Sequence, residues 1–91
     1  MNKTMKLLIQ GKVQGVGYRR WFEQQALEME LKGYVKNLPS GEVEAVIAGQ
    51  ADGVQDMIER SHTGPARAAV TRIIQIELDQ KHDFRIFEIA G

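Results

Sequence analysis

A short glycine-rich stretch carries the residues of this chain best suited to holding an anion. Gly15 and Gly17 precede Arg19, and they lie between an alternating apolar segment and a segment with helical periodicity. Glycines permit backbone angles that turn successive N–H groups inward, and such a nest binds anions. The helix that follows adds unpaired N–H groups and the positive end of its dipole. The arginine adds a fixed fork of donors that matches two oxygens. This stretch therefore predicts a phosphate or carboxylate site.

The residue types alone leave alternatives open. Glycines between a strand and a helix often only make a turn, and an arginine in the first turn of a helix is usually solvated. Lys12 and Arg20 are close enough in sequence to be the basic partner in place of Arg19. The chain has no cysteine, which excludes the thiolate nucleophile of cysteine-dependent phosphatases. If the chain cleaves a phosphate bond, we expect water to be the nucleophile.

The segments around this stretch alternate between strand and helix periodicity. Apolar residues alternate in the expected strands, and they recur at helical spacing at Phe22, Ala26 and Met29 and again at Val54, Met57 and Ile58. Gly33 is a candidate C-cap of the first helix and Asp52 a candidate cap of the second, which stops at Gly64-Pro65. The expected strands are 4–11, 34–38, 43–49, 69–79 and 84–89, with a turn at 81–83, and the first helix covers 20–31.

This order predicts an α+β fold of the ferredoxin-like, split βαβ (βαββαβ) type. We expect an antiparallel sheet with two helices on one face and a short extra C-terminal strand. Residues 1–91 are enough for a single domain and leave no room for a separate cofactor domain. The fold hosts many functions, so it decides none of them.

Composition narrows the function classes. The formal net charge is zero, which argues against a general nucleic-acid binder. No long apolar run suggests a signal peptide or a membrane helix, and the missing cysteines fit a reducing compartment, so we expect a soluble cytoplasmic protein. His62 and His82 lie far apart and lack ligand spacing, so we interpret both as surface residues and expect no metal. Trp21 and Tyr18 are expected to pack in the core.

Two stretches of the sequence resemble the signatures of the acylphosphatase family. Residues 11–19, Gly-Lys-Val-Gln-Gly-Val-Gly-Tyr-Arg, look like the first signature, and residues 33–37, Gly-Tyr-Val-Lys-Asn, look like the second. Residues 64–70 are similar to the family's usual Gly-Pro-x-x-Ala-x-Val run. The resemblance covers nearly the whole chain. The chain departs from the family at Ser61-His62-Thr63, where a leucine is common, and Arg20 places a second charge beside Arg19.

The resemblance implies a fold, a reaction and a set of site residues. It implies the ferredoxin-like fold and hydrolysis of acyl phosphates without metal or cofactor. Arg19 matches the family's phosphate-binding arginine, and Asn37 matches the asparagine that orients the attacking water. On residue type alone Asn37 is instead a turn residue ahead of Pro39. The backbone that would form the phosphate cradle is that of Gly15, Val16, Gly17, Tyr18 and Arg19.

The expected partners are a small acyl phosphate and inorganic phosphate or a similar anion, with no nucleic acid and no membrane, and the chain is expected to be a monomer. Three other roles stay open from the sequence. The chain could be an anion-binding module without turnover, an RNA-binding domain on the same βαββαβ plan, or a domain that acts on carbamoyl phosphate. An RNA-binding role requires exposed aromatic residues on the central strands and a basic surface.

Overall fold

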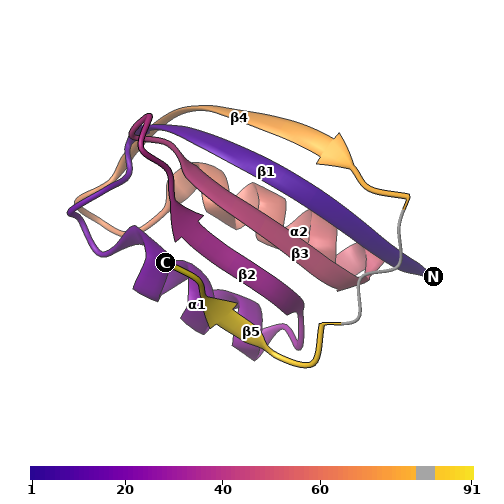
Figure 1. Ribbon diagram of the computed structural model, residues 1–91. Coiled ribbons are helices and arrows are strands. Elements are labelled where there is room, and N and C mark those ends of the chain that lie inside the picture. The colour runs from indigo at the N-terminus through magenta and orange to yellow at the C-terminus, as the bar shows by residue number, and fades with distance from the viewer. Residues whose placement is uncertain (80–83) are drawn as a thin grey trace.

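The computed structural model describes residues 1–79 and 84–91. One five-stranded sheet is covered on one face by both helices, and the other face is open (Figure 1). The strands lie in the order β4-β1-β3-β2-β5. The elements in chain order are β1 (Asn2–Lys12), α1 (Tyr18–Glu28), β2 (Lys32–Asn37), β3 (Val43–Gln50), α2 (Ala51–Thr63), β4 (Ala69–Glu77) and β5 (Phe87–Ile89). The ferredoxin-like α+β prediction is confirmed.

The sheet contains both antiparallel and parallel strand pairs. β1 pairs antiparallel with β3 and β4, and β2 pairs antiparallel with β3. The short β5 pairs parallel with β2, so the sheet is mixed at that edge and not antiparallel throughout. The chain reaches that edge after β4, which lies at the opposite edge, so its last residues return to the side of α1 (Figure 1).

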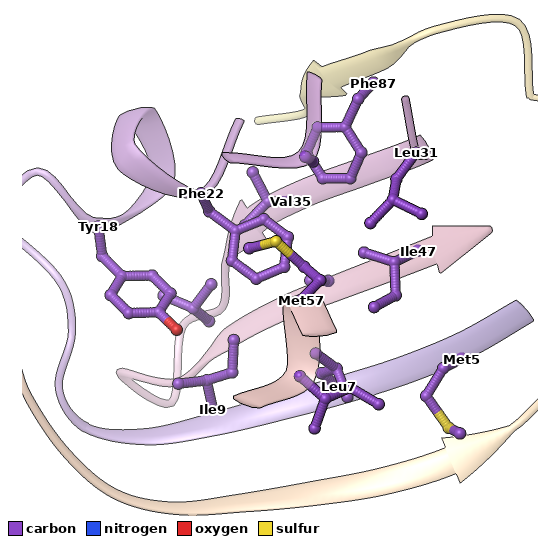
Figure 2. Packing of buried hydrophobic residues seen from close by; sticks show 14 of the residues in the cluster. Met5, Leu7, Ile9, Tyr18, Phe22, Leu31, Val35, Ile47, Met57 and Phe87 are labelled. Carbon is purple, nitrogen blue, oxygen red and sulfur yellow. The ribbon is translucent and has the colours of Figure 1, made fainter. Parts of the chain in front are cut away.

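The core lies between the covered face of the sheet and the two helices (Figure 2). Met5, Leu7 and Ile9 of β1 point into it, as the alternation predicts. From α1 the ring of Phe22 enters the same cluster and lies 5.6 Å from the ring of Phe87, which β5 supplies. The core therefore includes buried residues of both the first strand and the last, which join the two ends of the chain to one cluster.

The fourth strand presents its apolar residues differently from the expected pattern. Residues 70, 72, 74, 76 and 78 share one parity, but the register pairs Ile9 with Ile73 and Leu8 with Ile74. Directly paired residues share a face, so Ile73 packs on the core while Ile74 lies on the open face. Ile76 on the open face is 42% exposed. A bulge between Gln10 and Gly11 shifts the pairing, and this lets Val70 pack on the core as well.

The ends of the helices correct three predictions. The first helix covers Tyr18–Glu28, not 20–31, and its C-cap is Met29, not Gly33. Glu30 takes a left-handed conformation at φ 57°, and the N–H groups of Leu31 and Glu30 donate to the carbonyls of Ala26 and Leu27. This is the bond pattern of a Schellman motif, which glycine usually closes and which a glutamate closes here.

Gly33 belongs to β2 and donates its N–H to Ile86. Asp52 lies inside the first turn of α2 and makes no capping bond, because the N-cap is Gln50. The second helix stops at Thr63, as predicted, and its C-cap is Gly64. His62 is exposed, as predicted, and Tyr18 and Trp21 pack in the core region. The predicted turn at 81–83 and His82 lie outside the described residues.

Candidate active site

The glycine-rich loop joins β1 to α1 and has the backbone of an anion nest. Gly15 has φ 74° and Gly17 has φ 79°, while Val16 between them and Tyr18 and Arg19 after them have negative φ. Alternation of left- and right-handed residues turns neighbouring N–H groups toward one side. A Cβ on either glycine would meet nothing within 4 Å, so these glycines are needed for backbone conformation and the space beside them is open.

The beginning of α1 adds donors to this nest. The first helical bond is donated by the N–H of Trp21 to the carbonyl of Gly17. The N–H groups of residues 18–20 therefore precede the helix's own hydrogen-bond ladder. The cap residue Gly17 supplies no side chain to satisfy them, and the first turn contains no acidic residue. The helix dipole and these donors favour an anion at this point.

One hollow of about 210 Å³ brings the loop together with the end of β2. It is lined by Val13, Gln14, Gly15, Gly17, Tyr18, Arg19, Arg20, Asn37 and Ile89. Four of the five predicted cradle residues and Asn37 thus surround the same space. Val16 is not in the lining, and its side chain is buried among the core residues.

Strand parity brings Asn37 to this hollow. Asn37 is the last residue of β2, and it shares the covered face with Val35, two residues earlier. The preceding strand residues Tyr34 and Lys36 face the opposite, open side. Asn37 therefore points toward the helix layer at the end of the sheet where α1 begins. Its Oδ1 is buried and has no hydrogen-bond partner among the residues that the structure describes.

Arg19 is half-buried at the rim of the hollow, and β5 helps to place it. Its Nη1 donates to the backbone oxygen of Gly91 over 2.8 Å. Gly91 follows β5, and Figure 1 shows that this part of the chain lies beside the start of α1. Arginine has five donors, so this bond leaves most of the fork for another acceptor.

Two contributions to the site were not foreseen in the sequence. The side chain of Gln14 donates to the carbonyls of Leu38 and Glu42, each over 2.9 Å, and so ties the glycine-rich loop to the hairpin that follows Asn37. Gly91 is the second. Gln14 stands inside the glycine-rich stretch, which was its only signal, and no local pattern connects residue 91 with residue 19.

The open face of the sheet carries a different polar cluster. The Tyr34 hydroxyl donates to Glu44 over 2.8 Å, and Lys6 and Lys36 lie 3.4 and 3.7 Å from the same carboxylate. Burial and the bond to Glu44 raise the pKa of Tyr34 to about 12. Burial alone raises the pKa of Glu44, but the Tyr34 bond and the two lysines outweigh it and lower that pKa. These side chains satisfy one another, which does not favour the RNA-binding role.

Neither a metal centre nor a membrane helix is found in residues 1–79 and 84–91. No three His, Asp or Glu side chains of these residues gather in a way that could hold a metal ion. Neither α1 nor α2 is long and apolar enough to cross a bilayer.

Comparison with known proteins identifies the family of this chain. The acylphosphatase family model matches residues 5–89. An acylphosphatase of Alcanivorax borkumensis is 46% identical over 80 residues, which cover 88% of this chain and 87% of that protein. The solved structure of an acylphosphatase from Bacillus subtilis superimposes with a TM-score of 0.95 at 30% identity and covers 100% of both chains. That of an acylphosphatase from Coxiella burnetii has a TM-score of 0.93 at 34% identity and covers 98% of this chain and 93% of that one.

Proposed function

The chain belongs to the acylphosphatase family, and on that premise we propose that Arg19 binds the substrate phosphate and Asn37 orients the water that attacks it. The family hydrolyses acyl phosphates to a carboxylate and inorganic phosphate, and the chain shares this function. The observation that carries the assignment is the unpartnered Oδ1 of Asn37, which lies in the same hollow as Arg19 and the glycine-rich loop.

The phosphate is proposed to lie in a cradle of backbone N–H groups from Gly15 to Arg19. An acyl phosphate brings negative charge on its non-bridging oxygens, and that charge must be met where it lies in the transition state. The nest and the first turn of α1 supply donors without any acidic residue beside them. Arg19 adds a permanent positive charge with a fixed fork geometry.

The proposed step is an in-line displacement by water. The water oxygen forms a bond to phosphorus while the bond between phosphorus and the acyl oxygen breaks, and the electron pair leaves with the carboxylate. A carboxylate is a good leaving group, so no acid is needed to protonate it. Asn37 is too weak a base to take the water proton, but its amide can accept one hydrogen bond and donate another. The proton passes to the phosphate itself.

The setting proposed for this activity is simple. Residues 1–91 are proposed to act as one acylphosphatase domain, as a monomer and in the cytoplasm, and the proposed site needs no residue from a second chain. The missing cysteines are compatible with a reducing compartment. The charge of the phosphate is met by Arg19 and backbone donors, so the proposed step uses neither metal nor cofactor.

Phosphate release from benzoyl phosphate in the presence of a chelator tests this proposal. Arg19→Ala should reduce kcat/KM by about a thousandfold and weaken inhibition by inorganic phosphate, since it removes charge from both ground and transition states. Asn37→Ala should reduce kcat by about a hundredfold with little change in phosphate inhibition. Arg72→Ala and Asn2→Ala, which change exposed residues outside the hollow, are the controls.

Three results would contradict parts of the proposal. Unchanged turnover in Asn37→Ala would remove its role in placing water. Loss of wild-type turnover with the chelator would contradict the metal-independent step. Phosphate binding without any turnover by the folded wild type would identify an anion-binding module instead.

A further inference from the structure

The side chain of Tyr18 connects the cradle to a distant element. Tyr18 is the first residue of α1, and it lines the hollow together with Arg19. Figure 2 shows that its ring lies in the core beside Phe22. Tyr18 is only 1% exposed. The buried hydroxyl donates to the backbone carbonyl of Ser61 over 2.8 Å. One residue therefore joins the phosphate side of the loop to the C-terminal end of α2.

The carbonyl of Ser61 has few other ways to be satisfied. Ser61 lies in the last turn of α2, where the final four carbonyls of a helix have no intrahelical partner. The N–H of the C-cap Gly64 bonds instead to Arg60. Ser61 is fully buried, and its own hydroxyl is used on the carbonyl of Met57 over 2.7 Å. The Tyr18 hydroxyl thus satisfies a buried acceptor that water does not reach, and such bonds are costly to break.

A second contact fixes the ring itself. Gly64 has φ 65°, and a Cβ built on it would lie 2.9 Å from Cε2 and 3.3 Å from Cδ2 of Tyr18. The backbone at the end of α2 therefore packs directly on the face or edge of the ring, where a side chain would push it. The rings of Trp21 and Phe22 lie 5.5 and 6.1 Å from the Tyr18 ring. The ring is held on several sides, and the hydroxyl is held at its tip.

We propose that Tyr18 is a positioning residue, which anchors the cradle to the C-terminal turn of α2 through its hydroxyl and through its contact with Gly64. An aromatic side chain has only two rotatable bonds, so fixing the tip and the ring fixes the Cα at the start of α1. The N–H groups that meet the phosphate extend from this Cα in both directions. Catalysis by fixed donors depends on such preorganisation, because a donor that must move into place loses part of its effect.

The anchor lies where this chain departs from the family pattern. In the family motif the position that corresponds to Tyr18 is aromatic. The family often has a leucine near the end of the second helix. This chain has a tyrosine at position 18 and Ser61 in that helix, and the tyrosine hydroxyl donates to the backbone carbonyl of Ser61.

The proposal rests on the proposed use of the cradle for phosphate, and Tyr18→Phe compared with Tyr34→Phe tests it. Each change removes one hydroxyl that donates over 2.8 Å, the second of them to Glu44 on the open face. We expect Tyr18→Phe to raise the inhibition constant of inorganic phosphate and lower kcat, each by about threefold to tenfold. Tyr34→Phe should leave both constants unchanged. Equal kinetics in the two variants, with equal losses of stability, would show that the Tyr18 hydroxyl is only structural.

Two further variants locate the acceptor and the ring contact. Ser61→Ala keeps the backbone carbonyl and should keep phosphate inhibition at the wild-type value. Gly64→Ala should weaken phosphate binding in the wild type but much less in a Tyr18→Leu background, where no ring remains to be pushed. The backbone strain at Gly64 is the same in both backgrounds and cancels in this comparison. Equal effects in the two backgrounds would overturn the ring contact as a part of the anchor.

A measurement without any ligand separates this proposal from the proposed function. Backbone ¹⁵N relaxation of the amides from Gly15 to Arg19 reports how rigid the cradle is by itself. Tyr18→Phe should lower their order parameters, and Tyr34→Phe should not. Unchanged order parameters in Tyr18→Phe would overturn the anchor even if the enzyme is active, while an inactive wild type with this response would overturn only the proposed function.

Discussion

The two helices lie in the same layer, but their N-termini are built in opposite ways. The first turn of α2 contains Asp52, and its last turn contains Arg60 and His62, so its side chains complement the helix dipole. The first turn of α1 contains no acid and instead carries Arg19 and Arg20. Its cap is a glycine in a left-handed conformation, whereas the cap of α2 is an extended Gln50.

The start of α1 is less favourable for helix stability than the start of α2. Cations at a helix N-terminus are unfavourable by a few tenths of a kcal/mol up to about 1 kcal/mol. The same cations become favourable once an anion lies between them and the helix. The start of α2 follows the rules of helix stability, and the start of α1 breaks them where the phosphate is proposed to bind. Residue choices that lower local stability, such as cations at a helix N-terminus, are expected at functional sites for this reason.

Of the changes that compare the two helix starts, a change in the cap of α1 should have the largest effect. Gly17→Ala puts a Cβ into open space, so its cost is the left-handed conformation alone, about 1–2 kcal/mol. The loop can relieve that strain by turning its N–H groups away from the nest, and kcat/KM for benzoyl phosphate should fall by about a hundredfold. Gly41→Ala, at φ 96° with open space around it, is the control at a positive-φ glycine outside the hollow. A loss of stability without loss of activity in Gly17→Ala would mean that the nest is not used.

The second effect tests whether the cations of α1 serve the anion. Arg20→Glu gives the first turn of α1 an acid, as in α2. It should keep or raise the free energy of unfolding by about 0.5 kcal/mol, and it should weaken phosphate inhibition by about tenfold. Arg20→Gln should fall between the wild type and Arg20→Glu in both measurements. If phosphate binds Arg20→Glu as tightly as the wild type, Arg20 is only a solvated residue of the rim.

The contrast between the helix ends also shows what the sequence could and could not predict. Alternation at 4–11 and helical spacing after Tyr18 follow from local burial, so the order of elements and the fold were predictable. The C-terminal end of α1 was not predictable, because Glu30 takes the left-handed position that glycine usually occupies in this motif. The site residues that motifs carry, Arg19 and Asn37, were predicted and lie around one hollow. The contacts that hold them, from Gln14 and Gly91, join residues far apart and left no local pattern.

A smaller effect is expected at the other helix. Asp52→Arg replaces a favourable charge at the start of α2 with an unfavourable one, and it should lower the free energy of unfolding by about 1 kcal/mol. Values of kcat and KM should not change, because Asp52 is exposed and not part of the hollow. Denaturant unfolding and benzoyl phosphate kinetics on the same samples check both statements. Asp52→Asn should show about half of the loss, and a change in KM would connect this helix end to the site.

The smallest effect is an acid dependence that belongs to neither helix end. In the folded state the pKa of Glu44 is lowered from the ordinary glutamate value of 4.5. Burial alone would raise this pKa, but the hydrogen bond from Tyr34 and the charges of Lys6 and Lys36 outweigh it. The unfolded chain therefore binds more protons than the folded chain below this value. The stabilisation is complete above pH 4.5 and is lost as the pH falls through the lowered pKa. Glu42, whose pKa is lowered by bonds from Gln10 and Ser40, acts in the same direction.

Unfolding midpoints measured from about pH 6 down to about pH 3 should fall more steeply for the wild type than for Glu44→Gln. Glu44→Gln should keep the kcat and the phosphate inhibition of the wild type near neutral pH, because the cluster lies on the open face and outside the hollow. Arg20→Glu and Asp52→Arg should then retain their opposite effects at any pH above this window. If the acid dependence survives in Glu44→Gln, its source is another carboxylate. In that case the stabilities of Arg20→Glu and Asp52→Arg must be compared across the same pH range, because the carboxylates at the two helix starts would then titrate as well.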